Sequence, residues 1–113
     1  MGRFLLMAAA AALASLGSAS LAAAQDAQVQ RGIAVYAAQK CSLCHKIAGV
    51  GKRTTLDGVG TKSADEIRLW LTDAKAAAAK AKSTAKPVMK DYSKLPAADI
   101  DALVAYMKTL TTK

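Results

Sequence analysis

Cys41-Ser42-Leu43-Cys44-His45 is the stretch of this sequence on which its fold depends. The 113-residue chain has two Cys and one His in all, so every thiol and imidazole lies within these five residues. On a helical turn, positions i, i+3 and i+4 share one face. Cys41, Cys44 and His45 can therefore point at one flat ligand.

The spacing C-x-x-C-H is the signature of covalent haem attachment, in which the two thiols form thioethers and the imidazole lies below the iron. Three other uses fit less well. A thioredoxin-like dithiol follows a strand, and no strand pattern precedes Cys41. A zinc site needs four ligands, and an isolated carboxylate would have to complete this one. A disulfide across two residues closes too small a loop to stabilise much chain. We predict one covalent haem c, held by Cys41 and Cys44, with His45 as an axial ligand of its iron.

The first residues have the features of a cleavable secretory signal peptide. Arg3 provides a positive start, and residues 4–16 form an apolar run too short to span a bilayer comfortably. Ala22-Ala23-Ala24 then forms an A-x-A cleavage pattern. An uncleaved membrane anchor is the alternative. We predict a signal peptide over residues 1–24, one domain over residues 25–113, and a periplasmic location.

Apolar residues at helical spacing predict three or four helices, and no stretch alternates as a strand does. The first helix covers residues 29–40, and the last begins at Pro96. Between them a glycine-punctuated loop covers residues 46–62, and a capping box at Ser63 and Glu66 opens a middle helix. The three apolar stripes are Val29, Ile33 and Tyr36; Ile67, Trp70, Leu71 and Ala74; and Ile100, Leu103, Val104, Met107 and Leu110. The predicted fold class is all-α.

The predicted core is small. The chain has one Trp, three Tyr and a single Phe, which leaves with the signal peptide. Propensity favours continued helix over residues 75–86, but nothing in this Ala- and Lys-rich segment can form a core, and Pro87 stops any helix. Small domains of this kind usually need a disulfide, a metal or a large ligand for stability. A buried haem would supply the missing apolar mass.

Four methionines are candidates for the second axial position on the iron, and two of them leave with the signal peptide. Met107 belongs to the apolar stripe of the last helix. Met89 follows Pro87 in an irregular segment, far enough along the chain from His45 to return over the opposite face of the haem. Because His/Met is an established pair of haem ligands, we predict Met89 as the second axial ligand. An ordinary packed methionine is the alternative.

The mature chain resembles the monohaem class I cytochromes c of bacteria. The residues that carry this resemblance are Cys41 to His45, Leu56-Asp57-Gly58-Val59-Gly60, Pro87-Val88-Met89-Lys90-Asp91-Tyr92, Leu95, and Ile100 to Met107. The resemblance implies a small cytochrome c fold, with three to four helices wrapped around one covalently bound haem. It also implies that the first and last helices cross closely at Gly32.

Two positions depart from the pattern of that family. Thr54 and Thr55 stand where members often carry a Pro, whose carbonyl receives the proton of the His ring, so the acceptor for His45 is left open. Ala74 stands where a Pro often follows the third helix, and that helix is therefore expected to run longer than usual.

Charge points to a protein partner. The formal net charge of +8 suits partners with an acidic docking face. Export argues against nucleic acid, and no aromatic residues are interleaved with the basic ones. A candidate docking surface, with plain solvated surface as the alternative, consists of Lys46, Lys75, Lys80, Lys82, Lys86, Lys90 and Lys94. The indole N–H of Trp70 is a candidate donor to a haem propionate, with core packing as the alternative. Tyr92 is expected to pack, with a hydrogen bond to a propionate as the alternative.

These features predict an electron carrier rather than an enzyme. An iron with two axial ligands has no open position for a substrate, so we expect outer-sphere transfer of single electrons between exported or membrane-bound redox proteins. Membrane association would come only through those partners. Two alternatives stay open: a haem subunit fixed to an exported dehydrogenase, and a sensor or enzyme with a five-coordinate haem.

Overall fold

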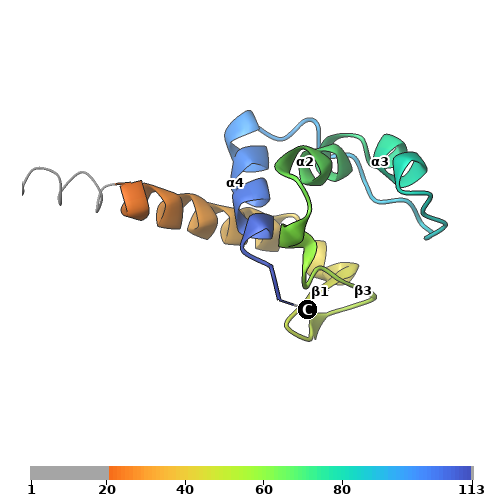
Figure 1. Cartoon of the computed structure of the whole chain (residues 1–113), viewed down its shortest axis with the longest axis horizontal. Coiled ribbons are helices and arrows are strands. Elements are labelled where there is room, and N and C mark those ends of the chain that lie inside the picture. Colours follow the sequence, from red (N-terminus) through yellow and green to blue (C-terminus); the bar gives the residue numbers. More distant parts are fainter. Residues whose placement is uncertain (1–20, 113) are drawn as a thin grey trace, which may run out of the picture.

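The computed structural model describes residues 21–112, and its elements are mostly helical (Figure 1). Residues 21–38 lie in an N-terminal helix. The elements that follow are η1 (Cys41–Leu43), β1 (His45–Ile47), β2 (Val50–Gly51), β3 (Thr54–Thr55), η2 (Val59–Thr61), α2 (Ala64–Thr72), α3 (Ala74–Lys80) and α4 (Ala97–Lys108). The predominantly helical class is thereby confirmed.

Most of the predicted signal peptide lies outside the described residues. The predicted cleavage point after Ala24 falls within the N-terminal helix, whose residues 21–28 are all exposed. Cleavage there stays a prediction. Within residues 21–112 no helix is long and apolar enough to cross a membrane.

The N-terminal helix crosses α4 at Gly32 (Figure 1). A Cβ on Gly32 would overlap the carbonyl oxygen of Ala102 and lie 2.7 Å from Cβ of Tyr106, so this approach requires glycine. Next to the crossing, the rings of Tyr36 and Tyr106 meet edge to face with centroids 5.8 Å apart. The close crossing that the resemblance implied is present in the structure.

This crossing corrects one residue of the predicted first stripe. Ile33 is 39% exposed, whereas Gly32 is buried and Val29 and Tyr36 are half-buried. The close contact at Gly32 fixes how the N-terminal helix is rotated about its axis. Ile33 therefore lies at the edge of the contact with α4 and is partly open to solvent. Periodicity alone does not count a glycine as part of an apolar face.

The core lies between α2 and α4. Its buried side chains are Ile67, Leu71, Ile100, Leu103, Val104 and Met107. The capping box that begins α2 is present in part, because the Ser63 hydroxyl accepts a hydrogen bond of 3.1 Å from the backbone N–H of Glu66. The middle and last stripes are thus confirmed, except that Trp70 and Leu110 are only half-buried and Leu110 lies beyond the end of α4.

The middle helix does not run on past Ala74 as expected. It ends at Thr72, and Asp73 has non-helical backbone angles of φ −151° and ψ 75°. The Asp73 carboxylate accepts from the N–H of Ala76 at 3.1 Å, which caps a separate α3. Aspartate is favoured at this capping position. Asp73 therefore ends the middle helix, as the proline often found in that family would. α3 also stops at Lys80, well before Pro87, and it does contribute to the packing, because Ala77 is 3% exposed.

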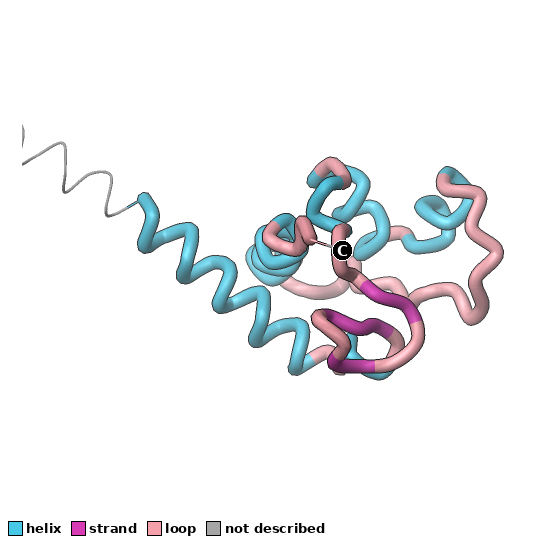
Figure 2. Tube along the Cα trace, turned by 60° about the horizontal axis from the view of Figure 1, so that its bottom comes forward, coloured by secondary structure: helices cyan, strands magenta, loops and turns pink. Residues whose placement is uncertain are grey.

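The loop over residues 46–62 contains short strands that the sequence did not reveal (Figure 2). β1 lies between the other two, antiparallel to β2 and parallel to β3, with His45 in register with Thr54. Gly51 has a φ of 121°, and a Cβ there would overlap the carbonyl oxygen of His45. Strands of two or three residues are too short to show alternation. They matter here because they position His45.

Candidate functional site

The turn that contains both cysteines directly follows the N-terminal helix. Lys40, two residues after the end of that helix, has a left-handed backbone conformation with a φ of 57°. The N–H of Cys44 donates to the carbonyl of Cys41 at 3.1 Å. The turn is a 3₁₀ turn, and His45 already belongs to β1. Cys41 and Cys44 thus lie at the two ends of a 3₁₀ turn and His45 begins the strand that follows, so the three residues do not share one turn of α-helix.

The two cysteine side chains differ in environment. Cys41 is half-buried and Cys44 is exposed. Burial raises the pKa of the Cys41 thiol, and a charge on Cys44 would raise it further. Because the thiols are three residues apart and one of them faces solvent, a large ligand can approach both.

His45 is half-buried and contacts Thr54 across the strand pair. Its Nδ1 lies 3.2 Å from the hydroxyl oxygen of Thr54. Burial lowers the pKa of His45, and a hydrogen bond to the backbone of Thr54 opposes that effect. A neutral imidazole is the form that binds a metal ion. Since Nδ1 faces Thr54, Nε2 is the ring nitrogen left for a ligand.

Met89 is brought near His45 by the segment that follows α3. It is half-buried and packs against the core, and the backbone N–H of Tyr92 donates to the carbonyl of Leu71 at 2.9 Å, which ties the segment to α2. Met89 also lines a cavity of about 350 Å³ beside α3, together with Asp73, Ala74, Lys75, Val88 and Asp91. That cavity does not reach the cysteine turn, so it is not by itself the predicted haem site.

Trp70 lies half-buried on α2. The residue is not part of the core cluster. Its predicted contact with a haem propionate therefore stays a prediction. Tyr92, by contrast, packs against the core as expected.

The surroundings of the turn fit a flat apolar cofactor. Several side chains pack against the core while remaining partly open to solvent, among them Ile47, Leu56, Val59, Met89 and Tyr92. The partly open apolar side chains are thus compatible with a haem.

Within residues 21–112, the buried hydroxyl of Tyr36 has no hydrogen-bond partner. Burial raises the pKa of Tyr36 to about 12, and the charges of a Cys41 thiolate and of Tyr106 add to the effect. The same part of the chain has no cluster of three or more metal-binding His, Cys, Asp or Glu side chains.

The comparisons with known proteins agree with this chemistry. A family model for cytochrome c matches residues 29–111, which is most of the chain. The chain therefore belongs to the cytochrome c family, and the resemblance to its class I monohaem members is confirmed. No curated protein and no solved structure matches the chain significantly.

Membership of this family establishes several coarse properties. The cofactor is a covalently bound haem c with its iron, and Cys41 and Cys44 fit the attachment motif. The family supports electron transfer through haem, and its members are typically carriers rather than enzymes. Class I domains are commonly exported to the periplasm in bacteria.

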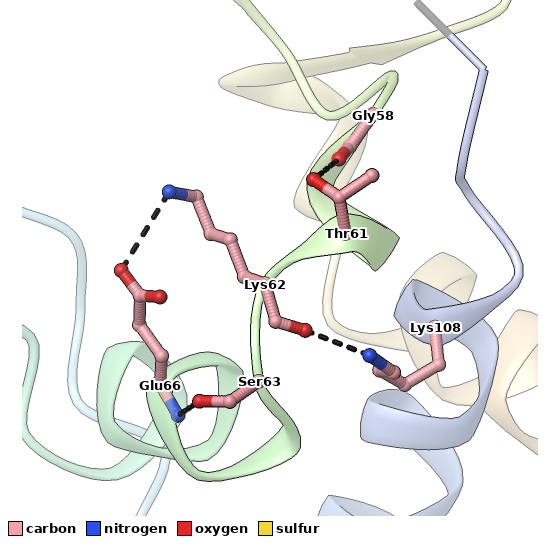
Figure 3. A network of polar contacts seen from close by, with 6 residues as sticks. All are labelled: Gly58, Thr61, Lys62, Ser63, Glu66 and Lys108. Atoms are coloured by element: carbon pink, nitrogen blue, oxygen red, sulfur yellow. Dashed lines mark hydrogen bonds and ion pairs between the residues drawn. The ribbon is translucent and has the colours of Figure 1, made fainter.

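Lys108 has a structural role that the sequence analysis missed (Figure 3). Its ammonium donates to the carbonyl of Gly60 at 2.9 Å and to that of Lys62 at 2.7 Å. The N–H of Gly60 also donates to the carbonyl of Leu110 at 2.8 Å. These bonds tie the loop before α2 to the end of α4. A lysine in the last turn of a helix is normally explained by the helix dipole, so nothing in the sequence marked this second role.

The seven lysines proposed for docking are available at the surface. All are exposed except Lys46, which is half-buried. The ion pairs within residues 21–112 join Arg31 to Asp99, Lys62 to Glu66 and Arg68 to Asp101, so none of the seven takes part. Lys90 lies over the ring of Tyr92, with its ammonium 5.7 Å from the ring centre.

Proposed function

We propose that this protein is an exported carrier of single electrons, with one haem c ligated by His45 and Met89. The observation that carries the proposal is the approach of Met89 to His45 in a chain of the cytochrome c family with one C-x-x-C-H turn. The haem, when bound, supplies reversible one-electron chemistry at its iron.

The protein contributes attachment, ligation and exclusion of water. Cys41 and Cys44 hold the cofactor covalently, so it is not lost between reactions. His45 and Met89 would both hold the iron of a bound haem, which would leave no place for a substrate. The thioether of Met89 would favour the reduced iron and raise the reduction potential. The apolar side chains that pack against the core while partly open to solvent would help to keep water from the iron.

The basic surface suits docking to acidic redox partners. The exposed lysines are not paired with carboxylates within the described residues, so their charge is free to steer an acidic protein into place. Weak, steered docking allows rapid exchange of partners, which a mobile carrier needs. The predicted signal peptide over residues 1–24 would direct the protein to the periplasm, where this exchange would occur.

Protein purified from the periplasm tests this proposal. We expect the mass of residues 25–113 plus one haem, haem that stays attached on a denaturing gel, and reversible oxidation and reduction by one electron. Haem extracted by acidified organic solvent would contradict covalent attachment. Isolation only within a stable complex with a dehydrogenase would favour the fixed-subunit alternative.

A further inference from the structure

The hydroxyl group of Thr54 lies between His45 and the backbone of the cysteine turn. It donates to the carbonyl of Cys44 at 3.1 Å and lies 3.2 Å from Nδ1 of His45. A hydroxyl has one proton and two acceptor lone pairs. Because the Thr54 hydroxyl donates its one proton to the carbonyl of Cys44, its oxygen can only accept a hydrogen bond from the ring of His45.

The backbone holds this hydroxyl in place. The N–H of Thr54 also donates to the carbonyl of Cys44, at 3.2 Å. In addition, Thr54 and His45 are register partners in the parallel pair of β1 and β3. Thr54 is thus tied to the cysteine turn by both its backbone and its side chain, and these bonds favour the rotamer that directs the hydroxyl to the ring.

We propose that the Thr54 hydroxyl is the acceptor that holds His45 as the Nδ1–H tautomer and presents Nε2 to the iron. Thr54 is therefore a positioning residue for the axial ligand. The inference rests on the proposed ligation by His45. It assigns the acceptor to a side chain, at a position where the resembled family often has a proline and uses a carbonyl.

A hydroxyl in this position also affects the electronic properties of the ligand. Donation to the Cys44 carbonyl polarises the hydroxyl and makes its oxygen a better acceptor. A stronger bond from Nδ1–H makes the imidazole a more basic ligand, which stabilises the oxidised iron. Removal of the hydroxyl should therefore raise the reduction potential.

The backbone carbonyl of Thr54 is the competing acceptor, since backbone hydrogen bonding at Thr54 also acts on the pKa of His45. Substitution distinguishes the two, because Thr54→Val removes the hydroxyl and keeps both the carbonyl and the side-chain shape. Thr54→Ser keeps the hydroxyl. Thr55→Val is a matched control, since the Thr55 hydroxyl accepts from the N–H of Asp57 at 3.1 Å and Thr55 is in register with Lys46 rather than with His45.

The experiment uses the haem-loaded protein and these three variants. In the reduced state, the exchange of the His45 Nδ1 proton with solvent is followed by NMR, and the reduction potential is measured by titration. We expect Thr54→Val to exchange roughly fivefold faster, a factor consistent with the loss of one net hydrogen bond, and to have a higher potential. Thr54→Ser and Thr55→Val should match the unaltered protein in both measurements.

Unchanged exchange and potential in Thr54→Val would overturn the inference and assign the role to the carbonyl. If that variant fails to load haem, the unaltered reduced protein decides. A nuclear Overhauser effect between the Nδ1 proton and the Thr54 hydroxyl proton supports the inference, and a Thr54 rotamer with its γ-methyl toward the ring overturns it. The visible spectrum separates these results from failure of the proposed function, since low-spin haem persists in every loaded variant if His45 and Met89 are the ligands.

Discussion

Met89 and Met107 are chemically identical side chains placed in different surroundings. Met107 is 6% exposed within the core, whereas Met89 is half-buried in the segment after Pro87. We expect Met89→Ala to lower the reduction potential and to open the iron to carbon monoxide, because thioether ligation stabilises the reduced state. Absorbance and redox titration measure both effects.

Met107→Ala is the matched control for that substitution. It should cost about 2–5 kcal/mol of unfolding free energy, as loss of a buried methionine typically does, while leaving the haem spectrum unchanged. If Met107→Ala alters the spectrum and Met89→Ala does not, the axial assignment is wrong.

Tyr36 makes the stability depend on pH in the alkaline range. Burial raises its pKa above the ordinary value of 10.0, and the charges of a Cys41 thiolate and of Tyr106 add to the effect. In the haem-loaded protein Cys41 would be an uncharged thioether, so burial is the main cause that remains, and the pKa stays raised. The unfolded chain therefore loses this proton first, and the free energy of unfolding should fall as the pH rises above about 10. Tyr36→Phe should reduce that fall, as measured by urea unfolding of the haem-loaded protein at several pH values.

At neutral pH the same substitution should leave stability unchanged or higher, because within residues 21–112 the hydroxyl has no partner to lose. The pKa values of Tyr92 and Tyr106 are also raised by burial, so the test lies in the difference between variant and unaltered protein. A clear loss of stability at neutral pH would show instead that the Tyr36 hydroxyl finds a partner when haem is bound.

Single site residues could be predicted when they lie next to one another in the sequence, and less well when the fold brings them together. Cys41, Cys44 and His45 are contiguous, so their spacing alone indicated their chemistry. Met89 was singled out by elimination among four methionines. Thr54 was noticed only as a departure from a family pattern, because its partnership with His45 depends on a strand pairing that the sequence does not show.

At the scale of elements, Lys108 connects the end of α4 to the loop over residues 56–62. We expect Lys108→Met to cost about 1–3 kcal/mol of unfolding free energy, since two carbonyls lose a charged donor while the aliphatic part of the side chain is kept. Urea unfolding of the haem-loaded protein measures the change.

Lys94→Met is the control, because Lys94 is exposed and outside the ion pairs of the described residues. An equal effect in the two variants would mean that loss of charge, and not the contact with the loop, causes the change.

The helices were largely predictable, and the exceptions have physical causes. Capping residues and apolar spacing located α2 and α4, because both signals are local. The break at Asp73 was missed because an aspartate between two Ala-containing segments is compatible with a continuous helix as well as with a cap. The strands around His45 were missed because they are only two or three residues long and are set by glycine turns rather than by alternation.

For the whole molecule, the net positive charge should govern association with partners. The formal net charge is +8, and six of the seven proposed docking lysines are exposed. If these lysines steer an acidic partner, the bimolecular electron-transfer rate should fall steeply with ionic strength, since screening acts over about 10 Å at 0.1 M salt. Stopped-flow measurements over a salt series check this. A rate that does not change with salt would show that these lysines are ordinary solvated surface and do not steer a partner.

The visible spectrum of the unaltered, haem-loaded protein tests the His45/Met89 site most directly. The oxidised protein should show the charge-transfer band of a methionine bound to iron, and the reduced protein should not bind carbon monoxide. Both results follow if the two axial positions are filled by residues of this chain. Absence of the band, together with binding of carbon monoxide by the reduced protein, would contradict the account and indicate a five-coordinate haem.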